Sequence, residues 1–242
     1  MKSSNQTTAG SHSGDCTLVI MAKAPKPGVV KTRLAQSLPL AAVVELYRCL
    51  LDDTMALARS LDDVQVAIMC PASDVEDLSR TVGDLIPIVA QSGDGLAAGL
   101  TSVFAHFAAT GHRRIVAFNS DSPHLPASVL KSAFRALARR DVVIGPTHDG
   151  GYYLVGATAP HPGLFAGDGL GTTNAYEALL GRVRALGLSV SLTDPFYDID
   201  VADDLTRLAG ELESVPARAP RTAQWLMECR KAIPPEQSGG DR

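Results

Sequence analysis

Short apolar, β-rich runs alternate with longer helical patterns along most of this chain. The first such run, residues 16–22, is continuously apolar and ends in a loop of Lys, Pro and Gly residues. A run of this kind is typical of a strand buried on both faces of a parallel sheet. Apolar residues at helical spacing follow at 39–60. The alternation predicts an α/β fold, in which a single domain has a mostly parallel central sheet with helices on both faces.

The remaining elements continue this order. Strands are expected at residues 64–70, 86–90, 114–119, 141–145, 152–157 and 188–193, and helices at 74–82, 96–109, 127–139 and 173–186. Outside the α/β domain, which we place at 16–210, we expect a disordered tail at 1–15 and a C-terminal extension at 211–242. The extension should hold a short helix at 221–232 and a polar end.

Composition excludes several classes of partner. The 22 basic and 26 acidic residues give a net charge of -4, which argues against a nucleic-acid-binding surface. No apolar run approaches the roughly 20 residues that span a bilayer. The four cysteines are far apart and form no CxxC pair, as expected for reduced thiols. We therefore expect a cytoplasmic protein.

A cationic loop follows the first predicted strand. Lys23, Lys26, Lys31 and Arg33 lie within a Pro/Gly-rich segment, and backbone N–H groups combined with Lys and Arg are what a phosphate chain requires. Lys31-Thr32 resembles the end of a P-loop, but Val30 occupies the position of its glycine, which excludes that motif. A solvated basic loop is the alternative interpretation.

Acidic residues follow three later strands. Asp121 comes after the strand at 114–119, where it could instead cap a helix, and Asp149 precedes two glycines, where it could instead form a hairpin turn. Asp198 and Asp200 point to one side of an extended segment. Since ligands of open α/β sheets collect at the carboxyl ends of strands, the pattern predicts transfer chemistry at a nucleotide's phosphate chain. Oxygen ligands indicate Mg²⁺ or Mn²⁺.

Four segments carry a resemblance to a known family. They are Ala22-Lys-Ala-Pro-Lys-Pro-Gly28 with Lys31-Thr-Arg-Leu34, Asn119-Ser-Asp-Ser-Pro123, Gly145-Pro-Thr-His-Asp-Gly-Gly-Tyr-Tyr-Leu154, and Tyr197-Asp-Ile-Asp-Val-Ala-Asp-Asp-Leu205. In order and spacing the chain resembles the bacterial DUF2064 group of glycosyltransferase-A-like proteins. These are relatives of the nucleotidyltransferases that make guanylylated phospholactate and molybdopterin guanine dinucleotide.

The resemblance implies a nucleotide-diphospho-sugar transferase fold and a role for each segment. Nucleotide and phosphate binding would fall to Ala22, Lys23, Gly28, Lys31, Arg33, Asn119 and Ser120. Metal binding would fall to Asp121, Asp198 and Asp200, and the acceptor side to Gly150, Gly151 and Tyr152. The resemblance further suggests Asp121, Asp149 and Lys31 as the catalytic residues.

Two segments depart from the family pattern. In Gln91-Ser-Gly-Asp-Gly-Leu-Ala-Ala-Gly99, the residues Gly95, Ala97 and Gly99 stand where Asp, Gly and Arg are expected. The usual Trp-Ser-Thr segment is Gly171-Thr-Thr173. Because a lost Arg removes a bidentate anion contact, donor or acceptor preference should differ from that of the relatives.

Several functions remain open at this point. Glycosyl transfer from a nucleotide-sugar to a small acceptor is slightly favoured. Nucleotidyl transfer from a nucleoside triphosphate to a phosphorylated small molecule is the alternative, and a third possibility is a non-catalytic relative that binds nucleotide. The run at 93–98 fits a dinucleotide fingerprint, but it follows the third strand rather than the first, which argues against an oxidoreductase.

Overall fold

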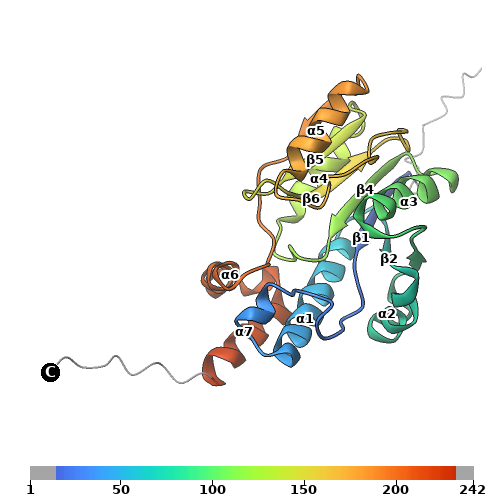
Figure 1. The fold of residues 1–242 in the computed structure, drawn as a ribbon. Coiled ribbons are helices and arrows are strands. Elements are labelled where there is room, and N and C mark those ends of the chain that lie inside the picture. The colour runs from blue at the N-terminus through green and yellow to red at the C-terminus, as the bar shows by residue number, and fades with distance from the viewer. Residues whose placement is uncertain (1–14, 233–242) are drawn as a thin grey trace, which may run out of the picture.

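The computed structural model describes residues 15–232 (Figure 1). The strands are β1 Cys16–Met21, β2 Gln65–Cys70, β3 Ile88–Ala90, β4 Arg114–Asn119, β5 Val142–Pro146, β6 Tyr152–Ala157 and β7 Val190–Leu192. The helices are α1 Leu40–Arg59, α2 Val75–Val82, α3 Gly95–Ala109, α4 Ala127–Ala136, α5 Ala175–Ala185, α6 Ala202–Ser214 and α7 Pro220–Ala232. Apart from Asp15, the predicted tail at 1–15 lies outside the described residues, as does the polar end beyond 232.

The seven strands form one sheet in the order β3-β2-β1-β4-β6-β5-β7. Strands β1 to β4 run parallel to one another, and β7 runs parallel to β5. Strand β6 is antiparallel to both of its neighbours, β4 and β5. The connection between β5 and β6 is too short for a parallel crossover, which needs a dozen or more residues, so these strands form a hairpin. The predicted mostly parallel α/β domain is confirmed.

Helices cover both faces of this sheet because successive strand side chains point to opposite sides. Leu18 and Ile20 of β1 pack with α1, α2 and α4, whereas Val19 packs with α3 and α5. All three side chains are fully buried. Each contributes about 1.5–3 kcal/mol relative to an exposed position. This two-sided core holds the strand ends, and therefore the loops that follow them, in fixed positions.

A third core joins the C-terminal helices to the N-terminal half of α1. Figure 1 shows α6 and α7 beside α1, and side chains of all three helices share one apolar cluster. The carboxylate of Asp53 in α1 accepts hydrogen bonds from the backbone N–H groups of Arg221 (3.1 Å) and Thr222 (2.8 Å), so α1 caps α7. The predicted boundary at residue 210 falls inside α6. Among residues 15–232, no helix has the length and apolar character to cross a bilayer.

Candidate functional site

The carboxyl ends of β1 and β4 lie side by side in the sheet. Met21 pairs with Asn119, the last residues of the two strands. The cationic loop therefore leaves the sheet next to the segment that carries Asp121. Asp198 and Asp200, the acidic pair, follow β7 in a segment that folds back across this edge of the sheet. There the Ile199 N–H donates to the carbonyl of Asp121 at 3.0 Å. Three segments distant in sequence thus meet at one edge of the sheet.

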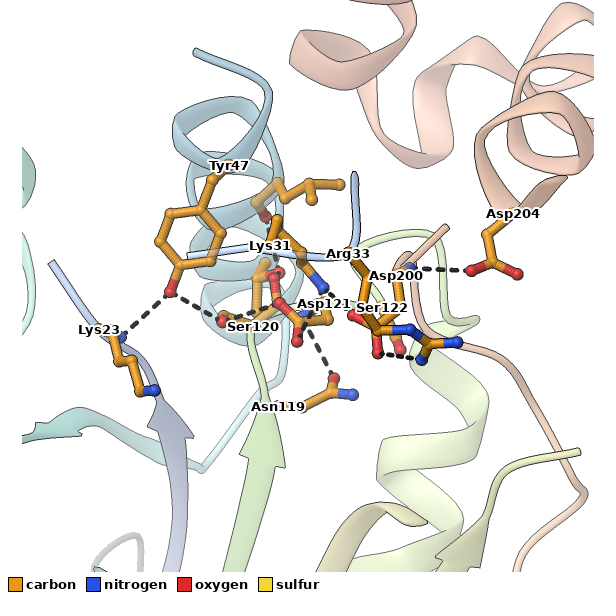
Figure 2. Close-up of polar contacts among 12 residues, drawn as sticks. Lys23, Lys31, Arg33, Tyr47, Asn119, Ser120, Asp121, Ser122, Asp200 and Asp204 are labelled. Carbon is orange, nitrogen blue, oxygen red and sulfur yellow. Dashed lines mark hydrogen bonds and ion pairs between the residues drawn. The ribbon is translucent and has the colours of Figure 1, made fainter. Parts of the chain in front are cut away.

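Lys31 lies at the centre of this meeting point. Its Nζ is 3.0 Å from Oδ2 of Asp121 and 2.8 Å from Oδ1 of Asp200, and Figure 2 shows the three side chains pointing toward one another. The Lys31 side chain is 3% exposed, and its φ of +50° is in the left-handed region that a residue with a side chain rarely adopts. The loop therefore accepts a costly backbone conformation at the residue whose ammonium joins the two carboxylates.

Charges around Lys31 outweigh its burial. Burial disfavours the ammonium, but Asp121 and Asp200 together raise the pKa of Lys31 above its ordinary value. Arg33 adds a weaker contact, with Nη1 3.5 Å from Oδ2 of Asp200, and its side chain is mostly exposed. Lys31 is therefore a fixed positive charge, while the guanidinium of Arg33 faces open space.

Asp198 completes a cluster of three carboxylates. One oxygen each from Asp121, Asp198 and Asp200 lie within 4.8 Å of one another. Burial, with the carboxylate of Asp200 beside it, raises the pKa of Asp198 to about 7. Since Lys31 can neutralise one of three negative charges, and since oxygen donors at this spacing suit a hard divalent cation, the donor set fits Mg²⁺ or Mn²⁺.

The segment that carries the acidic pair is held from two sides. On one side, the hydroxyl of Ser122 donates to the carbonyl of Tyr197 at 3.1 Å. On the other, Oδ2 of Asp204 accepts hydrogen bonds from the N–H groups of Asp200 (2.9 Å) and Val201 (2.8 Å). Asp204 lies in the first turn of α6, where an acidic residue is common, and it also fixes the backbone of Asp200. No local sequence pattern distinguishes these two roles, so the contact with Asp200 was not predicted.

A hydrogen-bonded relay connects the cationic loop to Asp121. The Lys23 N–H donates to the hydroxyl of Tyr47 at 3.1 Å, which lies 3.1 Å from the hydroxyl of Ser120, which in turn donates to Oδ1 of Asp121 at 3.2 Å (Figure 2). Burial raises the pKa of Tyr47 to about 12. No sequence pattern identifies Tyr47 as a site residue, because its spacing in α1 is that of a core position.

Two cavities meet over this cluster. The larger, of about 600 Å³, follows the cationic loop and is lined by Ala22, Lys23, Lys31 and Ser120 among others. The smaller, of about 300 Å³, lies toward β6 and the start of α5. The residues that line both cavities are Met21, Arg33, Leu96, Asp121 and Asp200. The cations and carboxylates therefore lie at the boundary between a larger and a smaller ligand-sized space.

Asp149 belongs to the smaller cavity. It sits in the β5–β6 hairpin turn, where its Oδ1 accepts hydrogen bonds from the hydroxyl of Thr147 (2.5 Å) and the N–H of Gly151 (3.4 Å). The turn depends on Gly150, whose φ is +90° and where a Cβ would overlap the carbonyl of Thr173. The segment therefore forms a hairpin turn, and residues of that turn also line the smaller cavity. Tyr152 and Gly151 line that cavity as well.

Several predicted residues lie outside the larger cavity. Gly28 lines neither cavity, although its φ of +73° explains why the loop has a glycine there. Asn119 lines the smaller cavity instead. Gly150 lines neither cavity, and its carbonyl accepts a hydrogen bond from the N–H of Tyr176 at 3.0 Å. Lys26 lies apart from the carboxylate cluster and pairs with Asp74 at 3.1 Å and with Asp77 at 2.7 Å. The cationic loop therefore directs Lys31 and Arg33, but not Lys26, to the cluster.

The departures at 95–99 also have structural consequences. Gly95 lines the larger cavity, at the start of α3. Gly99 is buried, and a Cβ there would come within 2.7 Å of Oε1 of Gln91 and 3.0 Å of Cε of Met21. A larger side chain at this position would therefore require the ends of the Gln91 and Met21 side chains to move.

Part of this chain matches a known protein family. The family model described as "Uncharacterized protein conserved in bacteria (DUF2064)" matches residues 54–172. The predicted family resemblance is confirmed. The match includes Asp121 and Asp149, whereas Lys31 and the acidic pair lie outside it.

Longer similarities cover most of the chain. The chain is 28% identical over 216 residues to a 2-phospho-L-lactate guanylyltransferase of Methanothermobacter thermautotrophicus, covering 88% of this chain and 90% of that protein. A protein of Desulfovibrio desulfuricans G20, provisionally named a nucleotide-diphospho-sugar transferase, has a TM-score of 0.82 at 26% identity. That similarity covers 90% of this chain and 96% of that chain. The predicted transferase class is confirmed.

The fold is shared more widely. The inositol-1-phosphate CTP transferase of T. maritima has a TM-score of 0.54 at 14% identity, with 83% of this chain and 96% of that chain covered. At this identity the similarity concerns the fold alone. It shows that the two proteins share the overall fold.

Proposed function

We propose that the protein is a divalent-metal-dependent nucleotidyltransferase that uses a nucleoside triphosphate and a small phosphorylated acceptor. The observation that carries this proposal is the convergence of Lys31, Asp121 and Asp200 at the boundary between two cavities. Lys31 and Arg33 would offset the charge of the triphosphate in the larger cavity. The acceptor would occupy the smaller cavity.

The carboxylate cluster would hold the metal ion. Asp121, Asp198 and Asp200 present oxygen ligands close together, and a bound Mg²⁺ or Mn²⁺ would neutralise phosphate charge and polarise the reacting phosphoryl group. Ser122 and Asp204 would keep the segment of the acidic pair in place through their backbone hydrogen bonds. Lys31 would retain a positive charge throughout, because its ammonium is stabilised by two carboxylates.

The reaction balances without a protein base. An oxygen of the acceptor phosphate would form a bond to the α-phosphorus of the triphosphate, and the bond from that phosphorus to the leaving pyrophosphate would break. The attacking phosphate is already largely ionised at pH 7, since its second pKa is about 6. The departing pyrophosphate carries more charge than a single phosphate, which the adjacent Lys31 and Arg33 are suited to neutralise.

Nucleotidyl transfer is preferred here over the glycosyl transfer that the sequence slightly favoured. The similarity to a guanylyltransferase extends over 88% of the chain, and no finding favours glycosyl transfer specifically. We also propose a cytoplasmic location, which is supported by the four free cysteines at positions 16, 49, 70 and 229.

The test separates the possible reactions by their products. The protein is incubated with Mg²⁺ or Mn²⁺ and either a panel of nucleoside triphosphates with phosphorylated acceptors or a panel of nucleotide-sugars with hydroxylated acceptors. Acceptor-dependent release of pyrophosphate would support the proposal, whereas release of a nucleoside diphosphate would identify glycosyl transfer. Nucleotide binding without any turnover would refute the proposal and identify a non-catalytic relative. Asp200→Asn and excess EDTA are the controls, and both should abolish turnover.

A further inference from the structure

We infer that the acceptor is a small phosphate monoester that carries a hydroxyl or amino group and no carboxylate. This inference rests on the proposed function, because it concerns what occupies the smaller cavity during nucleotidyl transfer. It is carried by the charges and hydrogen-bonding groups that line that cavity.

Positive charge in the smaller cavity is confined to its boundary. Among the described residues that line it, Arg33 is the one cationic side chain, and it also lines the larger cavity. The guanidinium is mostly exposed and contacts Asp200 at 3.5 Å, so donors remain free for a ligand. The acceptor phosphate should therefore lie at this boundary, where a nucleophile must be placed to reach the triphosphate.

The rest of the lining favours donors and disfavours a second anion. Of the four carboxylates that line the cavity, Asp121, Asp198 and Asp200 form the proposed metal site, which leaves Asp149. The hydroxyl of Thr147 and the N–H of Gly151 bond to Oδ1 of Asp149, which leaves its Oδ2 to accept a hydrogen bond from the acceptor. A hydroxyl or ammonium group satisfies that oxygen, whereas a carboxylate would be repelled by it.

The remaining walls limit the size and polarity of the acceptor. Leu96, Leu100, Leu170 and Tyr152 supply apolar surface, and the neutral polar side chains include those of Thr172 and Thr173. The cavity measures about 300 Å³, at the lower end of the range for small-ligand sites. A short, hydroxylated or aminated phosphate ester fits these walls.

The test measures acceptor binding and turnover separately. The full chain is loaded with Mn²⁺ and a non-hydrolysable triphosphate analogue, and four probes are titrated by calorimetry: glycerol phosphate, ethanolamine phosphate, ethyl phosphate and phosphoglycolate. We expect glycerol phosphate or ethanolamine phosphate to bind at least about 10-fold more tightly than phosphoglycolate, because like charges at Asp149 oppose the carboxylate. Either should also bind more tightly than ethyl phosphate, which lacks the donor.

Two variants distinguish recognition from a structural effect. Asp149→Asn keeps the shape of the side chain but removes its charge, so it should reduce the discrimination against phosphoglycolate several-fold. Damage to the turn would instead weaken all four probes together. Arg33→Gln should weaken all four probes by a similar factor, because each carries a phosphate, while their order is kept.

The outcomes separate this inference from the proposed function. Phosphoglycolate binding as tightly as the hydroxylated and aminated probes, ethyl phosphate matching them, or no binding of any probe would each overturn the inference. Pyrophosphate release that is fastest with phosphoglycolate would overturn it while supporting nucleotidyl transfer. Discrimination in binding without pyrophosphate release from any triphosphate would sustain the inference about the cavity and refute nucleotidyl transfer.

Discussion

Replacement of Lys31 by Met gives the sharpest test of the charge arrangement. The change removes an ammonium that is 3% exposed and pairs with two carboxylates at 2.8 and 3.0 Å, and it leaves those carboxylates facing each other. Removal of one partner from a buried ion pair costs about 3–5 kcal/mol. Because the Asp121 and Asp200 side chains are 26% and 33% exposed, solvent reduces this cost, and we expect a loss of about 2–3 kcal/mol.

Thermal unfolding measures this loss. For a chain of this size, 1 kcal/mol corresponds to about 2–4 °C in Tm, so Lys31→Met should lower Tm by about 4–12 °C in metal-free buffer. Saturating Mn²⁺ should reduce the difference from wild type to less than half, because a divalent cation on the carboxylates replaces the missing charge. The wild-type protein gains less, since Lys31 already neutralises part of the cluster.

Lys26→Met is the matched control. Lys26 belongs to the same loop and also pairs with two carboxylates, but it lies apart from the cluster and is partly exposed. Its replacement should lower Tm by less than half as much as that of Lys31, with no dependence on Mn²⁺. The reasoning is wrong if Lys31→Met leaves the metal-free Tm within about 1 °C of wild type, or if its deficit is the same with and without Mn²⁺.

Three further predictions address the metal site, the C-terminal core and pH. Asp121→Asn and Asp200→Asn should each weaken Mn²⁺-dependent triphosphate binding at least about 10-fold in calorimetry, with little loss of fold by circular dichroism; unchanged affinity in either variant would contradict the metal assignment. Asp53→Ala removes a buried acceptor of two N–H groups and the Thr222 hydroxyl. This substitution should lower the free energy of unfolding, measured in urea, by about 2–3 kcal/mol without changing nucleotide affinity. A loss below about 0.5 kcal/mol would show that water replaces the carboxylate as the cap of α7. His124 is fully buried, and burial, with Arg218 and Arg207 nearby, lowers its pKa to about 3. The unfolded chain therefore binds a proton that the folded protein excludes, so stability is lost as pH falls below about 6.5. By pH 5 this linkage lowers the free energy of unfolding by about 2 kcal/mol relative to neutral pH. His124→Phe should remove that loss, whereas parallel curves of stability against pH for the two proteins would exclude this role of His124.

Local patterns determined the elements of the fold. Every strand expected from an apolar run, from the one at 16–22 to the one at 188–193, has a counterpart in the sheet, and the expected helices lie between them. Such patterns are reliable because periodicity and turn residues act over a few positions of the backbone. The same locality explains why the loops after β1 and β4 could be singled out as candidate site segments.

Sequence patterns left the pairing of these segments open. Lys31 and Asp200 are separated by 169 positions, and Lys26 has the same charge and loop as Lys31 but a different set of partners. The roles of Tyr47 and Asp204 depend on which segments lie opposite them, so neither could be identified from spacing. The antiparallel insertion of β6 between β4 and β5 likewise follows from a hairpin whose register is set by packing.

The amino-acid sequence by itself determined that this chain forms alternating strands and helices, and that its charged loops follow strand ends. The tertiary structure alone decided that one lysine and three aspartates share a boundary between two cavities. The physical reason is that backbone conformation responds to neighbouring residues, whereas contacts between distant segments are fixed by burial of the two faces of one sheet.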